Sequence, residues 1–264
     1  MENSLDLIVF AGQSNMSGRG DASKAPDCCW GFEYKSISDP DKLVPIIEPF
    51  GLGEDRPGGL DDRYSGGTRR SGSMVSAFVN EYHKVTGREI VAVSASKGGT
   101  NTEEWLGGLI DDAVARLDKA KQFLTVNGVG ISNIFVVWCQ GESDGDLKQS
   151  GERYMSNLRQ LFDTFRSCGA EKCFVVQTGH YNYISYPDIS NGLSGAEWDD
   201  HYKTIRQAQK KLCDTDDDFV LVATLEPYIN DMKDRFHYNQ SAYNAVGKTA
   251  GANVGKYIAK TNGI

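Results

Sequence analysis

The sequence predicts an α/β protein with a mainly parallel sheet and helices on both of its faces. Apolar, β-branched runs recur along the chain, and each ends at a turn of small or polar residues. Segments with apolar residues at helical spacing follow most of these turns. This alternation is typical of parallel sheets, because neighbouring parallel strands need a crossover connection that is usually a helix.

Five segments are predicted strands and five are predicted helices. The strands lie at 5–11, 89–95, 131–138, 172–177 and 219–225, and the helices at 73–86, 103–124, 151–165, 199–213 and 239–259. A further apolar segment at 43–50 contains Pro45 and Pro49, which allow at most an edge strand or an extended loop. The predicted sheet therefore has five strands.

Length and composition limit the domain organisation. The 264 residues fit one domain spanning 1–264. Residues 18–73 are rich in Gly, Pro and Asp and predict a long irregular loop. Since loops of this length in compact domains are usually functional, we expect it to form a wall of the active site.

The charge balance excludes some classes of partner. A formal net charge of -8 argues against nucleic acid, whose phosphates need basic residues, and a neutral or weakly charged substrate fits better. No apolar run is long enough to span a bilayer, and no leader peptide is visible, so we expect no membrane partner and a cytoplasmic location. The six cysteines lack the paired spacing of zinc sites, and we expect neither metal nor cofactor.

A candidate nucleophile follows the first predicted strand. The sequence GQSNM at 12–16 places Ser14 two residues after a glycine that ends the apolar run. In open parallel sheets, ligands bind beyond the carboxyl ends of the strands, where this serine would lie. The alternative interpretation is that Ser14 only caps a helix, because serine is a preferred N-cap residue.

Candidate base and orienting residues lie before the last predicted helix. Asp234 and His237 are three residues apart, so one turn can bring the carboxylate to the imidazole Nδ1 and leave Nε2 for Ser14. The alternative is a surface turn with a helix cap. His180 is a rival base that would need a carboxylate such as Asp188, and the remaining two histidines, at 83 and 201, fall on predicted helices.

Other strand ends offer donors for a tetrahedral oxyanion. The candidates are the backbone N–H of Ser14, the N–H of Gly98 or Gly99, with Gly99 preferred, and the side-chain amide of Gln140. Each comes from a different predicted strand end, so a parallel sheet would bring them together.

Four motifs together resemble the sialate O-acetylesterase and acetylxylan esterase group (carbohydrate esterase family 6-like) of the SGNH-hydrolase superfamily. They are GQSNM at 12–16, KGGT at 97–100, WCQGESD at 138–144 and DRFH at 234–237. The resemblance implies a flavodoxin-like three-layer α/β/α sandwich and metal-free Ser-His-Asp catalysis that removes acetyl groups from sugars. Gln13 and Gln140 stand where the wider superfamily carries Asp and Asn.

The sequence therefore predicts a serine carbohydrate O-acetylesterase that acts through an acetyl-enzyme on acetylated sialic acid, xylan or another glycan. Gln13, Trp105 and Glu142 are expected substrate contacts, although Glu142, like Asp144, can instead stabilise its loop. Further aromatic residues suited to sugar stacking are Tyr34, Tyr181 and Tyr183. The alternatives are a lipase, thioesterase or esterase for other acyl esters, and a non-catalytic carbohydrate-binding protein.

Overall fold

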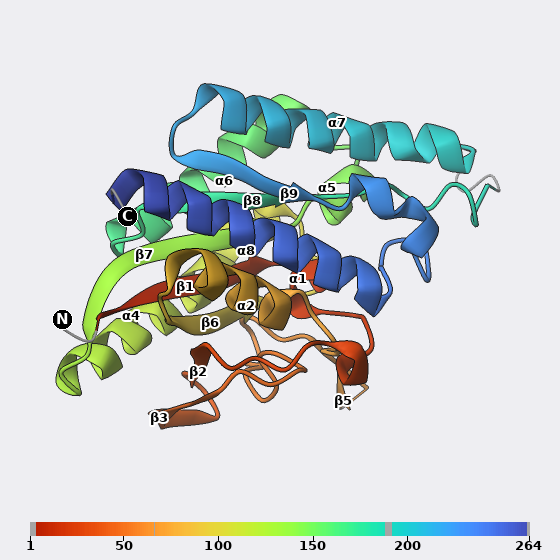
Figure 1. Cartoon of the computed structure of the whole chain (residues 1–264). Helices are drawn as coiled ribbons and strands as arrows, with labels where there is room; N and C mark the ends of the chain where they lie inside the picture. The colour runs from red at the N-terminus through yellow and green to blue at the C-terminus, as the bar shows by residue number, and fades with distance from the viewer. Residues whose placement is uncertain (1–3, 66, 188–191, 263–264) are drawn as a thin grey trace.

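A seven-stranded sheet forms the centre of the protein (Figure 1). The computed structural model describes residues 4–65, 67–187 and 192–262. The strand order is β3-β2-β6-β1-β7-β8-β9; β2 and β3 pair antiparallel, and every other neighbouring pair is parallel. The strands are β1 (Ser4–Gly12), β2 (Gly31–Lys35), β3 (Asp39–Pro45), β6 (Ile90–Ser96), β7 (Gly130–Cys139), β8 (Lys172–Gln177) and β9 (Phe219–Thr224).

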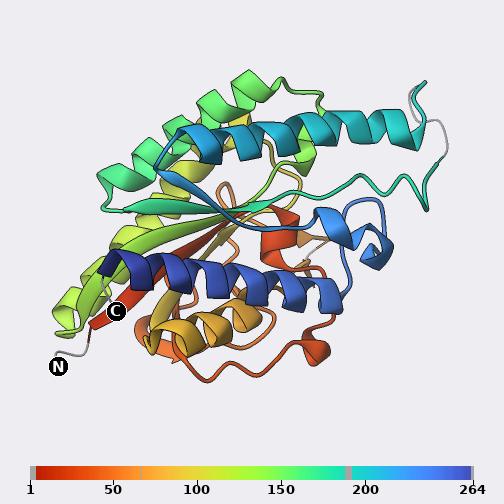
Figure 2. The ribbon, with the colours of Figure 1, turned by 45° about the horizontal axis from the view of Figure 1, so that its top comes forward.

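Helices cover both faces of the sheet, as Figure 2 shows, so the predicted three-layer α/β/α sandwich is confirmed. The longer helices are α2 (Val75–Thr86), α4 (Ile110–Val126), α6 (Gly151–Ser167), α7 (Gly195–Thr215) and α8 (Gln240–Asn262). The shorter segments are α1 (Ser14–Ser17), η1 (Ala22–Lys24), α3 (Thr102–Glu104), η2 (Trp105–Leu109), α5 (Glu142–Asp146), η3 (Glu226–Asp231) and the hairpin β4 (Arg63–Tyr64) with β5 (Gly67–Thr68).

The central strand β1 is buried on both sides, which explains its continuous apolar run. Successive side chains in a strand point to opposite faces. Leu7 and Val9 therefore pack with the core under α4 and α6, and Ile8 and Phe10 pack with the core under α2 and α8. All four side chains are fully buried.

The prediction of five strands was wrong, because the segment expected to be irregular at 18–73 supplies two more. β2 has only five residues, and β3 is largely exposed and ends at Pro45. Neither resembles the long apolar runs of the inner strands. β3 lies at the edge of the sheet, where a proline is tolerated.

The predicted helix at 103–124 is interrupted. Gly108 has φ +130°, a backbone conformation that helices do not contain, and the π-helical turn η2 separates α3 from α4. The predicted helix at 199–213 instead begins at Gly195, after a capping box in which the Ser194 and Glu197 side chains each accept the other's backbone N–H.

The sheet brings three strand ends together. Gly12 at the end of β1 is in register with Ser96 of β6 on one side and with Cys139 of β7 on the other. The loops that follow these three strands therefore start next to one another. Side chains that are far apart in the sequence can meet at this edge of the sheet.

Candidate active site

A glycine turn presents Ser14 at the end of β1. Gly12 has φ +137°, and a Cβ atom there would overlap the carbonyl oxygen of Cys139. Only glycine fits this close approach. Gln13 N–H then donates to the same carbonyl at 3.0 Å, and Ser14 begins the one-turn helix α1. The turn fixes the serine directly above the sheet edge.

Ser14, His237 and Asp234 form a continuous chain of hydrogen bonds. His237 Nε2 lies 2.9 Å from Ser14 Oγ, and His237 Nδ1 lies 2.9 Å from Asp234 Oδ2. The second carboxylate oxygen, Oδ1, accepts the backbone N–H groups of Phe236 and His237 at 2.8 Å each. A hydroxyl, an imidazole and a carboxylate in this order can activate the hydroxyl as a nucleophile.

The charge on Asp234 defines the role of each imidazole nitrogen. Burial raises the pKa of this carboxyl, but hydrogen bonds from His237 and from the backbone outweigh that effect and hold the pKa at about 2. An ionised carboxylate can only accept, so the Nδ1 of His237 carries the proton that it donates to Asp234. In neutral imidazole, Nε2 then accepts the proton of Ser14 Oγ.

A cavity of about 270 Å³ opens next to Ser14 and His237. It is large enough for an acetyl group with part of an alcohol. The residues that line it are Gln13, Ser14, Arg19, Arg69, Gly98, Gly99, Glu142, Ser143, Asp146, Phe236 and His237.

Backbone donors border this cavity. Gly98 N–H donates to Asp62 Oδ1 at 2.9 Å and is therefore already used. Neither Gly99 N–H nor Ser14 N–H donates to any other group in the described part of the chain, and both residues line the cavity. Of the two glycines that the sequence offered, Gly99 is the one with an available N–H.

The expectation that Gln140 supplies an oxyanion donor was wrong. Its side chain is fully buried, and its Nε2 donates to the carbonyl of Thr100 at 3.0 Å and to the carboxylate of Asp144. Both hydrogens of the amide are thus engaged inside the protein. Gln140 is also absent from the cavity lining, so its amide stabilises the loops behind the site.

Gln13 brings a side-chain amide to the wall of the cavity. Its Oε1 faces the backbone N–H groups of Gly141 and Ser143, at 3.4 and 3.3 Å. These contacts orient the amide so that Nε2 is the remaining donor, and within the described ranges Nε2 has no acceptor. From the sequence, Gln13 was expected only to contact the substrate. Its position next to Ser14 was the feature that could have pointed to it as a further donor.

The sequence of this chain matches one family of known proteins. The family described as "SASA: Carbohydrate esterase, sialic acid-specific acetylesterase" matches residues 4–255, which include every segment that builds the cavity. The chain belongs to this family. The predicted resemblance is therefore confirmed, and the esterase is a serine hydrolase of acetyl esters. None of the curated protein sequences matches the esterase.

Solved structures share the fold of the esterase. A protein from Arabidopsis thaliana has a TM-score of 0.67 at 21% identity, with 95% of this chain and 98% of that chain covered. A carbohydrate acetylesterase from Xanthomonas citri has a TM-score of 0.51 at 15% identity, covering 96% and 56%. A mutant form of an acetyl-xylooligosaccharide esterase from Geobacillus has a TM-score of 0.51 at 14% identity, covering 97% of both chains.

Trp105 does not contact the cavity of the esterase, contrary to expectation. Its side chain is 0% exposed, its ring packs edge-to-face on Trp138 at 4.9 Å, and its Nε1 donates to Thr100 Oγ1 at 3.1 Å. The π-helical turn η2 directs this residue into the core. Tyr34 and Tyr181 are also buried and unavailable for stacking on a sugar.

The two acidic residues after β7 are used inside the protein. Asp144 accepts from Thr102 Oγ1 at 2.6 Å and from Gln149 Nε2 at 2.7 Å, which ties two loops together. Burial raises the Asp144 pKa to about 6, although hydrogen bonds from Thr102 and Gln140 oppose the increase. Glu142 borders the cavity but is only 3% exposed, and its Oε1 accepts from Asn15. Burial also raises the pKa of Glu142, and the Asn15 bond opposes that increase.

The rival base His180 has another partner. Its Nδ1 lies 2.7 Å from Asp199 Oδ2, and Asp199 also pairs with Arg206. Asp188, the carboxylate that the sequence suggested, lies outside the described residues. His83 stacks on Trp30 with the ring centres 4.0 Å apart and does not line the cavity beside Ser14. His237 is the histidine that contacts Ser14.

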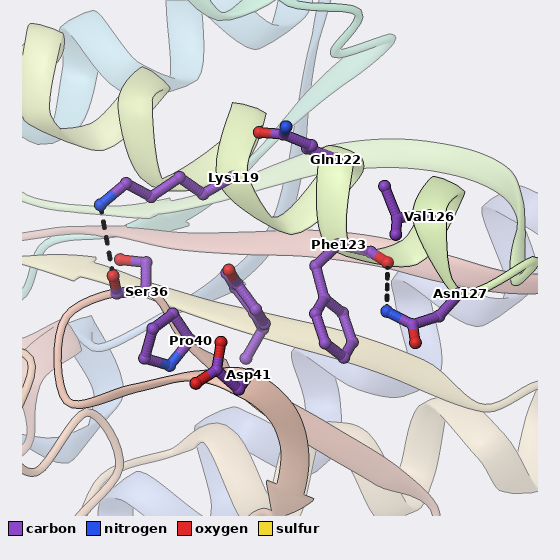
Figure 3. Close-up of a pocket in the computed structure, with 9 residues that line it drawn as sticks. Ser36, Pro40, Asp41, Lys119, Gln122, Phe123, Val126 and Asn127 are labelled. Atoms are coloured by element: carbon purple, nitrogen blue, oxygen red, sulfur yellow. Dashed lines mark hydrogen bonds between the residues drawn. The ribbon is translucent and has the colours of Figure 1, made fainter.

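A second cavity of about 510 Å³ lies between the β2–β3 edge of the sheet and α4 (Figure 3). Lys119 and Asn127 form hydrogen bonds along its wall, to the carbonyls of Ser36 and Phe123. No histidine lines this cavity, and Ser36 Oγ donates to the buried carboxylate of Glu54 at 3.3 Å. In the described ranges, no three His, Cys, Asp or Glu side chains are grouped to hold a metal ion, and no helix is both long and apolar enough to cross a bilayer.

Proposed function

We propose that the esterase removes acetyl groups from sugar hydroxyls through an acetyl-Ser14 intermediate. Ser14 Oγ attacks the acetyl carbonyl carbon while its proton passes to His237 Nε2. Asp234 stabilises the imidazolium that forms. The tetrahedral intermediate then expels the sugar oxygen, which takes the proton from His237. Water attacks the acetyl-enzyme by the same route, and acetate leaves.

The oxyanion in this proposal is held by the N–H groups of Ser14 and Gly99 and by Gln13 Nε2. The support is that all three residues line the cavity and that these donors have no other acceptor in the described part of the chain. Donors that are free before the reaction and fixed in place need little reorganisation as charge develops. The amide of Gln13 is fixed by two backbone contacts from the β7 loop.

The observation that carries the proposal is the pair of 2.9 Å contacts that His237 makes to Ser14 and Asp234. The experiment is a rapid-mixing measurement with 4-nitrophenyl acetate, followed by mass spectrometry of the quenched protein, both intact and after proteolytic digestion. We expect an initial burst of nitrophenol and a mass increase of one acetyl group on the peptide containing Ser14. A folded protein that shows neither turnover nor acetylation would favour the non-catalytic carbohydrate-binding alternative.

The cavity rim supports a substrate that carries a negative charge near the acetylated hydroxyl. Both oxygens of Asp62 accept from Arg19 Nη2 at 2.8 Å, so the charge of Arg19 is neutralised. Arg69 also lines the cavity, but its guanidinium pairs with no carboxylate in the described ranges and instead lies 4.2 Å from the ring centre of Tyr64. A carboxylate on the sugar would provide the missing partner for Arg69.

This proposal differs from the expectation of a neutral or weakly charged substrate, and it agrees with the sialic acid named in the family description. The test compares kcat/KM for O-acetylated sialic acid with that for acetylated xylo-oligosaccharides, in the native esterase and in Arg69→Gln. We expect the variant to lose about tenfold on the acidic sugar, the value of one charge-assisted hydrogen bond, and little on 4-nitrophenyl acetate. Equal losses on acidic and neutral sugars would refute recognition of the carboxylate.

A further inference from the structure

Asn15 connects the nucleophile to three other segments of the protein. Its Nδ2 donates to Glu142 Oε1 on the β7 loop and to the carbonyl oxygen of Phe236 at 3.1 Å. Its Oδ1 accepts from the hydroxyl of Tyr243 on α8 at 2.6 Å. Asn15, Glu142 and Tyr243 are all buried. One amide thus joins the turn after β1 to the β7 loop, to α8 and to the loop that carries the base.

The carboxylate of Glu142 determines which way this amide points. With Nδ2 toward Glu142 and Phe236, both amide hydrogens meet acceptors, and Oδ1 meets the Tyr243 hydroxyl. The reversed amide would place Oδ1 against a carboxylate oxygen and a carbonyl oxygen, which are both acceptors. A buried polar group without a partner costs about 1–3 kcal/mol, so the reversed orientation is excluded.

The contact to Phe236 matters because of how the base is held. Asp234 and His237 belong to one short loop, and their hydrogen bonds form within that loop. The 2.9 Å contact between His237 and Ser14, in contrast, joins segments 223 residues apart. Asn15 follows Ser14, and Phe236 precedes His237, so the bond between them spans the same junction one residue away from the reacting atoms.

We propose that Glu142 is a positioning residue that, through the amide of Asn15, holds the His237 loop in contact with Ser14. In this role its Oε1 acts on Asn15 and not on the substrate. This inference rests on the proposed function and deepens it. Glu142 lines the cavity, and its Oε1 accepts the hydrogen bond from Asn15 Nδ2 on which the proposed connection depends.

The experiment measures kcat and KM for 4-nitrophenyl acetate in four variants. Glu142→Ala should lower kcat by about a hundredfold, the effect of a displacement near 1 Å at reacting groups, with KM changed less than about twofold. Glu142→Gln keeps an oxygen for Asn15 Nδ2 and should recover at least about tenfold of that loss. Asn15→Ala combined with Glu142→Ala should be no slower than the slower single variant, because both remove one connection.

Two further measurements separate positioning from general destabilisation. Tyr243→Phe keeps the packing of α8 but removes the hydroxyl that donates to Asn15 Oδ1 at 2.6 Å and accepts from Tyr238 N–H at 3.5 Å. It should lower kcat several-fold and lower the free energy of unfolding by about 1–3 kcal/mol, so the protein should still be fully folded in the assay. In proton NMR, the low-field resonance of the His237 Nδ1 proton should persist in Glu142→Ala, because the Asp234 contact lies within the loop. This variant should therefore keep the dyad and lose turnover.

Several outcomes would overturn the inference. If the wild type is active and the kcat of Glu142→Ala lies within threefold of the wild-type value, the connection is not needed. An increase of KM at unchanged kcat makes Glu142 a substrate contact, and multiplicative losses in the double variant show two independent roles. A wild type without any esterase activity would instead overturn the proposed function, and this inference with it.

Discussion

Asp234→Asn is expected to abolish turnover because the backbone forces the new amide into one orientation. Asp234 Oδ1 accepts the N–H groups of Phe236 and His237, both at 2.8 Å. In the variant, only the amide oxygen can accept these two donors, so the NH₂ group must face His237 Nδ1. His237 Nδ1 then has to accept, and the proton of the neutral ring moves to Nε2. The tautomer that results cannot take the proton of Ser14.

The magnitude follows from this change of tautomer. In serine proteases the corresponding substitution lowers kcat about 10⁴-fold, which equals about 5 kcal/mol of activation free energy. We expect a loss of at least about 10³-fold here. KM for a small ester should change little, because the substitution alters neither the volume of the cavity nor the groups that donate to the oxyanion.

The stability of the variant is expected to fall far less than its activity. Lowering the Asp234 pKa from 3.8 to about 2 corresponds to about 2 kcal/mol, and solvent screening reduces this to about 1 kcal/mol because 41% of the side chain is exposed. The folded pKa lies below the unfolded one. The contribution is therefore complete above about pH 4 and disappears as the pH falls through 2.

The assay is steady-state hydrolysis of 4-nitrophenyl acetate beside urea unfolding at pH 7 and pH 2.5. A matched control is Asp231→Asn, which alters a carboxylate of the preceding turn that contacts Asn239 and not His237. The control should keep kcat within a few-fold. If Asp234→Asn retained more than a tenth of the native kcat, the reasoning from a forced tautomer would be refuted.

Three further predictions concern the nucleophile, the oxyanion and the acyl group. Ser14→Ala should fold normally and lose at least about a thousandfold in kcat, because nucleophile and base act as a unit; melting curves and ester hydrolysis check this, and near-native turnover contradicts it. Gln13→Ala should lower kcat about a hundredfold, as expected for the loss of one oxyanion donor. Gln140→Ala should mainly lower the free energy of unfolding, by about 1–3 kcal/mol. If the two variants showed the opposite pattern, Gln140 would be the oxyanion donor. The small volume of the cavity, about 270 Å³, should make kcat/KM fall from acetyl to octanoyl esters, and a rise along this series would favour a lipase.

The inner strands could be predicted because their chemistry is uniform. A strand buried on both faces must be apolar at successive positions, and β1 and β6 satisfy this along most of their length. The edge strands β2 and β3 could not be recognised in the same way. They are short, and β3 carries Pro40, Pro45 and three charged residues that an edge strand tolerates and an inner strand does not.

The candidate site shows a similar limit. Motifs next to strand ends were enough to predict which segments meet, because register brings Gly12, Ser96 and Cys139 together. Sequence could not decide between two amides at adjacent strand ends, since the direction of Gln13 and Gln140 depends on which backbone groups need partners. Three-dimensional contacts, not spacing along the chain, decide that choice.

The two residues next to Ser14 have different roles in our proposals, and one helical turn holds both in place. In our proposals, Gln13 donates to the oxyanion on one side, and Asn15 holds the base loop on the other. Ser17 Oγ fixes the same turn by hydrogen bonds to Gln13 O at 3.3 Å and to Ser96 Oγ at 3.0 Å. A shift of α1 by one residue would therefore misplace the nucleophile, the amide donor and the link to the base together. The three consecutive residues Gln13, Ser14 and Asn15 thus all depend on the position of this one turn.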